Sequence, residues 1–363
     1  MCIPRRILLI LALANVRSAL ALLRKQRRGD AELVDQNQTA EGPAYRIAIL
    51  TAGTLRRYFP RDVASNLIAP LVREGHTVDY FLSLNTEEFK AWKTYAQDFR
   101  SDPTVEAHGG NLTLVAQWID GLLSTAGASV RRLVLHEKVD ILTEATRSFA
   151  LNATGFHAGK GPHTLTVRSN VLKLLWQFER LWGSVQVEEA VHGHYDFVMT
   201  NKDDLLWMRP FSLNRVLRAP DREPFADDEH APAPLLDTPG PTQGYNMRCL
   251  LQAGSTYDAQ SEGGLTEYVL ILRREAAGPF LMLFTRLLEN PRYWQCHNLE
   301  HFMAVVTEEQ GVHFTTLPAA LLPAQRAGRL QRGNGTVTCI HKACDSATAT
   351  VGLLRPMDTF PIC

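Results

Sequence analysis

The sequence of 363 residues predicts an α/β protein with one main domain, built on a Rossmann-like, mostly parallel sheet with helices on both faces. Two observations predict this class. Short apolar runs alternate along the chain with longer segments of helical periodicity, as in parallel strands joined by helices. The first strand, helix and strand also fit within about forty residues, which is the length of a right-handed crossover unit.

The first unit begins at residue 45, after a polar segment that ends in Gly42-Pro43. Residues 45–53 are apolar and end in Thr51-Ala52-Gly53, small residues that leave room for a ligand to approach the backbone. Residues 62–73 have helical periodicity, and residues 77–84 predict the second strand.

The rest of the domain follows the same alternation. The predicted elements are a helix at 112–123, a strand at 132–136, a loop at 149–166, a long helix at 169–191, helices at 275–288 and 298–311, and a strand at 313–317. We predict a domain at 45–330, a long proline-rich surface loop or lid at 219–243, and a cysteine-bearing C-terminal tail at 331–363.

The most informative stretch runs from Tyr195 to Pro210. The apolar run Phe197–Met199 predicts a buried strand, and Asn201-Lys202-Asp203-Asp204 then brings four polar residues that are costly to bury without partners. Two carboxylates after a strand suit a hard divalent cation, because ligands gather at the carboxyl ends of strands in open α/β sheets. The plain alternative is a solvated turn.

The residues around these carboxylates resemble a known family. Tyr195-Asp196-Phe197-Val198, a basic residue, an Asp and Leu-Leu-Trp-Met-Arg-Pro resemble the metal-binding segment of poorly characterised eukaryotic GT-A-type glycosyltransferases, and so imply a GT-A-like sheet. The resemblance implies that Asp204 binds the metal and the sugar nucleotide, with Lys202 and Asp203 as cofactor-binding neighbours. A strict Asp-x-Asp motif would need an acid at Lys202, so the segment departs from that pattern.

Weaker matches extend the resemblance. The loop from Thr51 through Gly53 to Arg56 resembles the nucleotide loop of the family, which implies that these residues bind the cofactor and that Arg56 approaches the diphosphate. An ordinary turn with a solvated arginine is the alternative there.

Two acids and a histidine complete the implied site. Glu267 follows a Gly-Gly pair, and Glu300 lies at the start of a late helix; both match acidic positions of the family and are the candidate catalytic residues. A helix-capping or dipole-compensating role is the alternative for each. His341 in the tail is the candidate third metal ligand.

The implied activity is transfer of a sugar from a nucleotide-sugar donor to a hydroxyl of a glycan or protein acceptor, assisted by Mn²⁺ or Mg²⁺. The alternative is a catalytically inactive lumenal protein that binds a nucleotide or a glycan. Lys+Arg and Asp+Glu both number 38, and this neutral balance argues against nucleic acid as the partner. The chain also lacks a GxGxxG motif and a phosphate-binding loop with its lysine, which argues against NAD(P) enzymes and P-loop kinases.

The N-terminal residues predict the compartment. Residues 1–28 combine arginines with short apolar runs, as a signal peptide or signal anchor does, and residues 29–44 form a stem or linker. Sequons begin at Asn37, Asn111, Asn152 and Asn334. We expect the secretory pathway, either anchored in the Golgi lumen or secreted, with a mitochondrial presequence as the lesser alternative.

Overall fold

The computed structural model describes residues 42–86, 111–137, 141, 143–156, 164–207, 209–218, 243–247, 269–317, 322–333 and 336–342. The predicted targeting segment 1–28, Glu267, and nearly all of the linker 29–44 and of the loop 219–243 lie outside these ranges.

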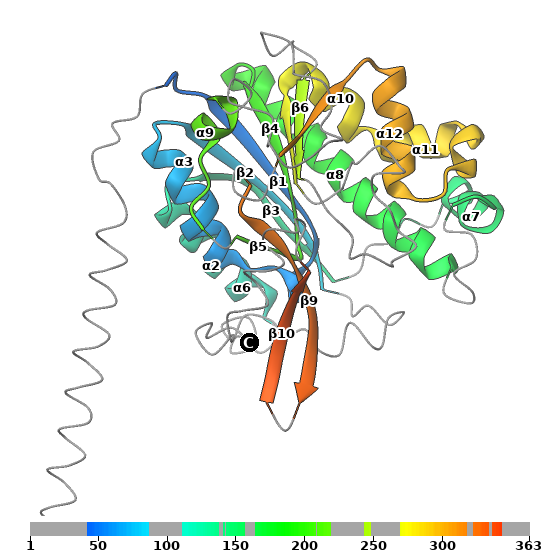
Figure 1. Cartoon of the computed structure of the whole chain (residues 1–363), viewed down its shortest axis with the longest axis horizontal. Helices are drawn as coiled ribbons and strands as arrows, with labels where there is room; N and C mark the ends of the chain where they lie inside the picture. The colour runs from blue at the N-terminus through cyan, green and yellow to red at the C-terminus, as the bar shows by residue number, and fades with distance from the viewer. Residues whose placement is uncertain are drawn as a thin grey trace, which may run out of the picture. The chain divides into compact units, whose positions relative to one another are not determined.

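The main sheet has seven strands in the order β3-β2-β1-β4-β7-β6-β8 (Figure 1). They are β1 (Arg46–Thr54), β2 (Thr77–Asn85), β3 (Ser129–His136), β4 (Phe197–Lys202), β6 (Gln243–Met247), β7 (Val269–Arg273) and β8 (His313–Leu317). Of these, β7 alone runs antiparallel to its neighbours, β4 and β6. The predicted α/β class with a mostly parallel sheet is confirmed, and this topology fits a GT-A-like fold.

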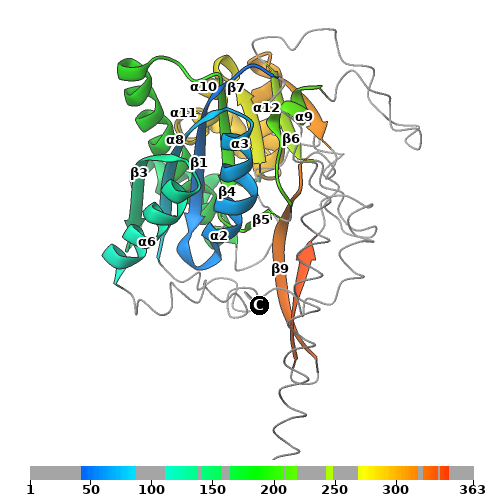
Figure 2. The ribbon, with the colours of Figure 1, turned by 90° about the vertical axis from the view of Figure 1, so that its left-hand side faces the viewer.

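Helices cover both faces of the sheet (Figures 1 and 2). One face carries α2 (Pro60–Asp62), the π-helical η2 (Val63–Ile68), α3 (Ala69–Arg73), α6 (Leu112–Thr125) and α9 (Leu213–Arg218). The other carries α7 (Glu144–Asn152), α8 (Thr164–His192), α10 (Arg274–Leu281), α11 (Leu283–Glu289), η5 (Pro291–Gln295) and α12 (Leu299–Glu309). Alternate residues of β1 supply the two cores, since Ile47 and Ile49 face one and Ala48 and Leu50 the other.

A second, smaller sheet has the order β10-β9-β5 and is antiparallel. Its strands are β5 (Leu205–Trp207), β9 (Ala324–Gly333) and β10 (Thr336–Lys342). Ala324–Arg326 of β9, which pair with the strand immediately after Asp204, lie within the predicted domain 45–330. Residues 331–333 and 336–342 of the predicted C-terminal tail complete β9 and form β10. None of the helices within the described ranges is long and apolar enough to span a bilayer.

Three local predictions are corrected by the structure. The predicted loop 149–166 begins inside α7, whose N-terminus is capped by Thr143. The predicted helix 62–73 is continuous, but its middle is the π-helical η2. The predicted helix 275–288 is split at Met282 into α10 and α11, three residues after Pro279, which cannot donate a backbone hydrogen bond.

Candidate functional site at the carboxyl ends of β1 and β4

The site lies where the strand order of the main sheet reverses direction. From β1 the chain builds β2 and β3 outward on one side, and β4 then pairs with the opposite edge of β1. Ala52 of β1 lies opposite Lys202 of β4, so the two parallel strands end side by side. In open α/β sheets this reversal point, at the carboxyl ends of the strands, is where ligands bind.

The residue pattern of both strands changes as they reach this point. On the face that packs against α3 and α6, both strands begin with apolar core residues (Ile47, Ile49, Phe197 and Met199). The next residues on that face are Thr51 and Asn201, both fully buried, and then Gly53 and Asp203. Two polar layers therefore replace the apolar core at the end of the strands.

Asp203 is fully buried and is held through one oxygen. Its Oδ2 accepts hydrogen bonds from the backbone N–H of Thr54 at 2.7 Å and from Nε of Arg57 at 2.8 Å, and lies 2.6 Å from Nη2 of Arg57. Its Oδ1 is buried and has no hydrogen-bond partner among the described residues. Burial raises the pKa of Asp203; Arg57 opposes this rise and Asp204 adds to it.

Gly53 makes this placement of Asp203 possible. Its φ is +141°, a conformation that L side chains rarely adopt. A Cβ on Gly53 would lie 2.1 Å from Cγ and 2.3 Å from Oδ1 of Asp203. The carboxyl group of Asp203 therefore occupies the space that a side chain at residue 53 would fill.

Arg57 connects the two carboxylates. It lies in the short 3-10 helix η1 (Leu55–Arg57), directly after β1. Its Nη1 is 3.5 Å from Oδ2 of Asp204, while Nε and Nη2 contact Asp203. The side chain of Arg57 is 22% exposed, against 2% for Asp204, so the guanidinium is the part of this cluster that reaches solvent.

Three residues predicted from the sequence lie close to this cluster along the chain: Arg56, Lys202 and Thr51. Arg56 is half-buried in the same turn, and the neighbouring Arg57, which sequence reasoning missed, contacts both Asp203 and Asp204. Lys202 is the last residue of β4 and is 7% exposed. The hydroxyl of Thr51 is engaged with Asn201 and Tyr80 inside the sheet. The double arginine after β1 was the sequence signal for a basic group at this point.

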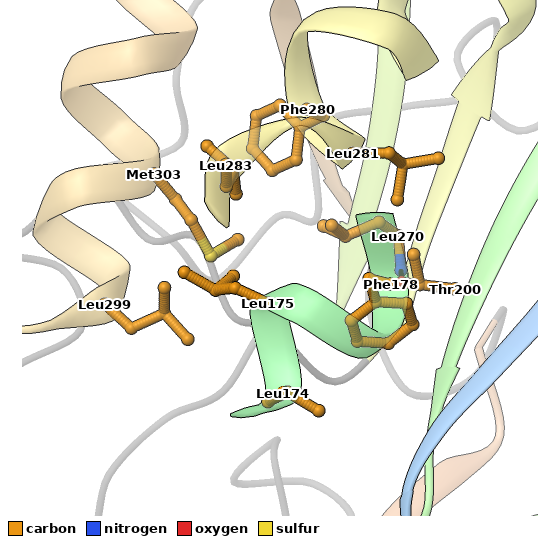
Figure 3. Close-up of a pocket in the computed structure, with 10 residues that line it drawn as sticks. All are labelled: Leu174, Leu175, Phe178, Thr200, Leu270, Phe280, Leu281, Leu283, Leu299 and Met303. Carbon is orange, nitrogen blue, oxygen red and sulfur yellow. Dashed lines mark hydrogen bonds between the residues drawn. The ribbon is translucent and has the colours of Figure 1, made fainter. Parts of the chain in front are cut away.

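Glu300 lies in the other helix layer. It is half-buried in the first turn of α12, where Asn298 caps the helix. The neighbouring Leu299 lines an apolar pocket of about 30 Å³ between residues of α8, β4, β7, α10, α11 and α12 (Figure 3). The catalytic role of Glu300 stays a prediction.

The backbone of His341 is brought to the level of the Asp203-Asp204 turn by strand register. Leu205 of β5 pairs with Arg326 of β9, and the next residue of β9, Ala327, pairs with His341 of β10. His341 therefore lies two ladder spacings, each about 4.8 Å, from the turn that precedes β5. Among the side chains that the structure describes, no group of three or more His, Cys, Asp or Glu residues is arranged to hold a metal ion.

The two carboxylates differ in how well they fit a divalent cation. Oδ2 of Asp203 already has three donors and Oδ1 lies against Gly53, so Asp203 does not fit a direct metal ligand in this arrangement. Oδ2 of Asp204 lies 3.5 Å from Nη1 of Arg57, a long distance for an ion pair. One carboxylate is enough for Mg²⁺ or Mn²⁺ when water and substrate phosphates supply the other ligands.

Comparisons with known proteins identify no family. No family model matches the chain, and no curated protein matches its sequence. Among solved structures, the chain is similar to mouse xyloside xylosyltransferase 1 in its apo form, with 12% sequence identity and a TM-score of 0.33. The match covers 76% of this chain and 86% of that protein, and it is too distant to transfer the role of any residue.

Proposed function

We propose that the protein is a metal-assisted glycosyltransferase of the secretory pathway, which transfers a sugar from a nucleotide-sugar donor to an acceptor hydroxyl. One observation carries the proposal. The Asp203-Asp204 turn and Arg57 lie together at the point where the strand order reverses, which is the ligand-binding position of open α/β sheets. The residues around Asp204 that resemble the GT-A-type segment support the same assignment.

The proposed roles follow from charge and position. Asp204 binds Mn²⁺ or Mg²⁺, which neutralises the negative charge that develops on the departing diphosphate. Arg57 adds a planar cation suited to paired phosphate oxygens. Asp203 anchors Arg57, because its carboxylate is buried and receives two guanidinium nitrogens. Lys202 and Arg56 are the further candidates for diphosphate contacts.

The residues proposed to act on the acceptor are candidates from the sequence. Glu267 and Glu300 are the candidate acids for contact with sugar hydroxyls or for accepting a proton from the acceptor. His341 is the candidate third metal ligand, supported by the register that brings β10 beside the turn.

The test is nucleotide binding by an Asp204→Asn variant. The change removes the charge that a hard cation needs but keeps the shape of the side chain. Wild-type protein should bind a nucleotide sugar more tightly when Mn²⁺ is added, as measured by calorimetric titration after a screen of donors. Asp204→Asn should lose that gain, about tenfold or more, whereas Asp120→Asn on the exposed surface of α6 should keep it.

A second candidate is an inactive protein that binds a nucleotide or a glycan. The observation that favours it is the pairing of both carboxylates with Arg57, which supplies a counter-ion without a metal. Release of free nucleoside diphosphate in the presence of acceptor glycans separates the two candidates. Mn²⁺-dependent nucleotide binding without any release of diphosphate would favour the binding protein. If Asp204→Asn keeps the full gain in nucleotide affinity on addition of Mn²⁺, Asp204 is not the metal ligand.

A further inference from the structure

Five buried side chains form a continuous hydrogen-bonded chain beneath the site. Nε1 of Trp207 donates to Oδ1 of Asn201 at 3.0 Å, and Nδ2 of Asn201 donates to Oγ1 of Thr51 at 3.0 Å. Oγ1 of Thr51 is hydrogen-bonded to the hydroxyl of Tyr80, which lies 3.1 Å from the hydroxyl of Tyr58. All five residues are at most 2% exposed.

The chemistry of the groups sets the direction at the Trp207 end of this chain. An indole N–H only donates, so the amide oxygen of Asn201 must face Trp207 and its NH₂ must face Thr51. In the Thr51–Tyr80 and Tyr80–Tyr58 pairs, either hydroxyl can be the donor. Burial raises the pKa of Tyr80 to about 12, against the opposing effect of its hydrogen bonds, and burial also raises that of Tyr58. Both phenols therefore keep their protons at neutral pH.

The two ends of this hydrogen-bonded chain lie next to the Arg57 loop and the Asp203-Asp204 turn. Tyr58 immediately follows Arg57, and Trp207 closes the three-residue strand β5 that begins immediately after Asp204. The hydrogen-bonded chain thus runs from the loop that carries the guanidinium, through β2, β1 and β4, to the strand that follows the carboxylates.

The position of these polar groups is not explained by core packing alone. The same face of β1 and β4 is apolar over its first residues, and burying polar groups is costly unless all of them are paired. Thr51 and Asn201 lie toward the ends of β1 and β4 that are followed by Arg57, Asp203 and Asp204.

We propose that Tyr80 and Asn201 are positioning residues, which hold the Arg57 loop and the Asp203-Asp204 turn at a fixed separation for the nucleoside diphosphate. The proposal deepens the proposed function and, as to the ligand, rests on it. Neither side chain contacts the diphosphate in this role. Both act indirectly, because the hydrogen-bonded chain links them to the Arg57 loop at one end and to the Asp203-Asp204 turn at the other.

The test compares two tyrosine hydroxyls of the same sheet. Tyr80→Phe removes the link between Thr51 and Tyr58, whereas Tyr195→Phe removes a buried hydroxyl at the opposite edge, where it donates to Asp79 at 2.7 Å. Hydrogen–deuterium exchange with mass spectrometry reports on residues 54–58 and 203–207. Calorimetry with Mn²⁺ and either UDP or GDP reports on binding.

Tyr80→Phe should raise amide exchange in both segments together and weaken metal-dependent binding of the diphosphate by about tenfold to a hundredfold. Tyr195→Phe should lower the melting temperature but leave both segments and binding unchanged. Unchanged exchange in Tyr80→Phe, or equal increases in the two variants, would overturn the proposal.

Two further measurements keep the outcome clear. If Tyr80→Phe does not fold, Tyr58→Phe removes only the last hydroxyl and should loosen residues 54–58 more than residues 203–207; no change would count against the chain. If wild-type protein binds neither diphosphate, the proposed function is in question, while the exchange data still decide whether Tyr80 couples the two segments.

Discussion

Gly53 is the residue on which the position of Asp203 depends most directly. Gly53→Ala should destabilise the protein by about 2–4 kcal/mol, because it adds overpacking against Asp203 to a strained φ. It should also weaken metal-dependent nucleotide binding, since Asp203 must move and Arg57 moves with it. Urea unfolding and calorimetry measure the two effects.

Gly183→Ala is the matched control for this substitution. Gly183 lies inside α8, and a Cβ there meets nothing within 4 Å. The control should gain about 0.5–1 kcal/mol of stability, because alanine favours helix over glycine, and should bind nucleotide as the wild type does. Equal stability of Gly53→Ala and wild type would mean that Asp203 is not packed against residue 53.

At this same scale, the limits of sequence reading are visible in two residues. The polar cluster after β4 and the small residues after β1 could be predicted, because polar groups that interrupt a buried pattern need a reason. The contacts of Arg57 with both carboxylates could not, because they depend on the φ and ψ angles of a three-residue 3-10 helix. The anchoring role of Asp203 depends on a contact with Gly53 across 150 residues of sequence, which leaves no local signal.

Among the strands, Asp79 lies near the amino end of β2 and connects three neighbouring residues of the main sheet. Its oxygens accept hydrogen bonds from Arg46 of β1 at 2.8 Å, from Arg131 of β3 at 2.8 Å and from Tyr195, which precedes β4, at 2.7 Å. Burial raises the pKa of Asp79, but the hydrogen bonds from Arg131, Tyr195 and Arg46 outweigh burial and hold that pKa below its ordinary value.

The sign of the resulting pH dependence follows from this lowered pKa. An acid with a lower pKa in the folded state contributes stability above its unfolded pKa, about 3.9, and loses that contribution as the pH falls through the folded pKa. Asp79→Asn should cost about 3 kcal/mol at pH 7, because it leaves two partly buried arginines without their carboxylate. The difference from wild type should shrink below about pH 4.

Urea unfolding of wild type and Asp79→Asn at pH 7, 5 and 3 measures this difference. The exposed substitution Asp120→Asn is the control and should shift stability little at any of the three values. A gap between wild type and Asp79→Asn that is the same at pH 3 and pH 7 would show that the charge of Asp79 does not contribute.

The elements themselves could be predicted where their periodicity is strong. The strands β1, β2, β4 and β8 and the helix α8 lie where the sequence predicts them, because each has a clear apolar pattern. Strands β6, β7, β9 and β10 were missed, since each follows or lies within a segment whose composition favours loops. The pairing of β5 with β9 joins residues far apart in the chain, and no local pattern encodes it.

At the scale of the whole molecule, the amino ends and the carboxyl ends of the parallel strands carry different kinds of polar groups. The amino end holds the ion-paired network of Asp79, and the carboxyl end holds Arg57, Asp203, Asp204 and the hydrogen-bonded chain beneath them. At the amino end, Asp79 accepts hydrogen bonds from Arg46, Arg131 and Tyr195, as expected of a structural network. At the carboxyl end, Oδ1 of Asp203 is buried without a hydrogen-bond partner among the described residues.

The compartment is a property of the whole chain, and its test is glycosylation. Asn111 and Asn152 begin sequons, and both side chains are exposed. Asn111 caps α6 through Oδ1, which accepts from the N–H of Leu114 at 3.2 Å, so a glycan on Nδ2 would leave the cap intact. Protein expressed in a secretory cell should therefore lose mass when an N-glycan-cleaving enzyme is added.

Each site can be assigned by substitution of its hydroxyl residue. Thr113→Ala and Thr154→Ala should each remove one glycan, whereas Thr113→Ser keeps the sequon and should retain it. Melting temperatures of the variants should stay close to that of wild type, because both threonines are exposed. An unchanged mass after enzyme treatment, together with a mitochondrial or cytosolic distribution in the cell, would contradict the proposed compartment while leaving the assignments of Asp204 and Arg57 open to their own tests.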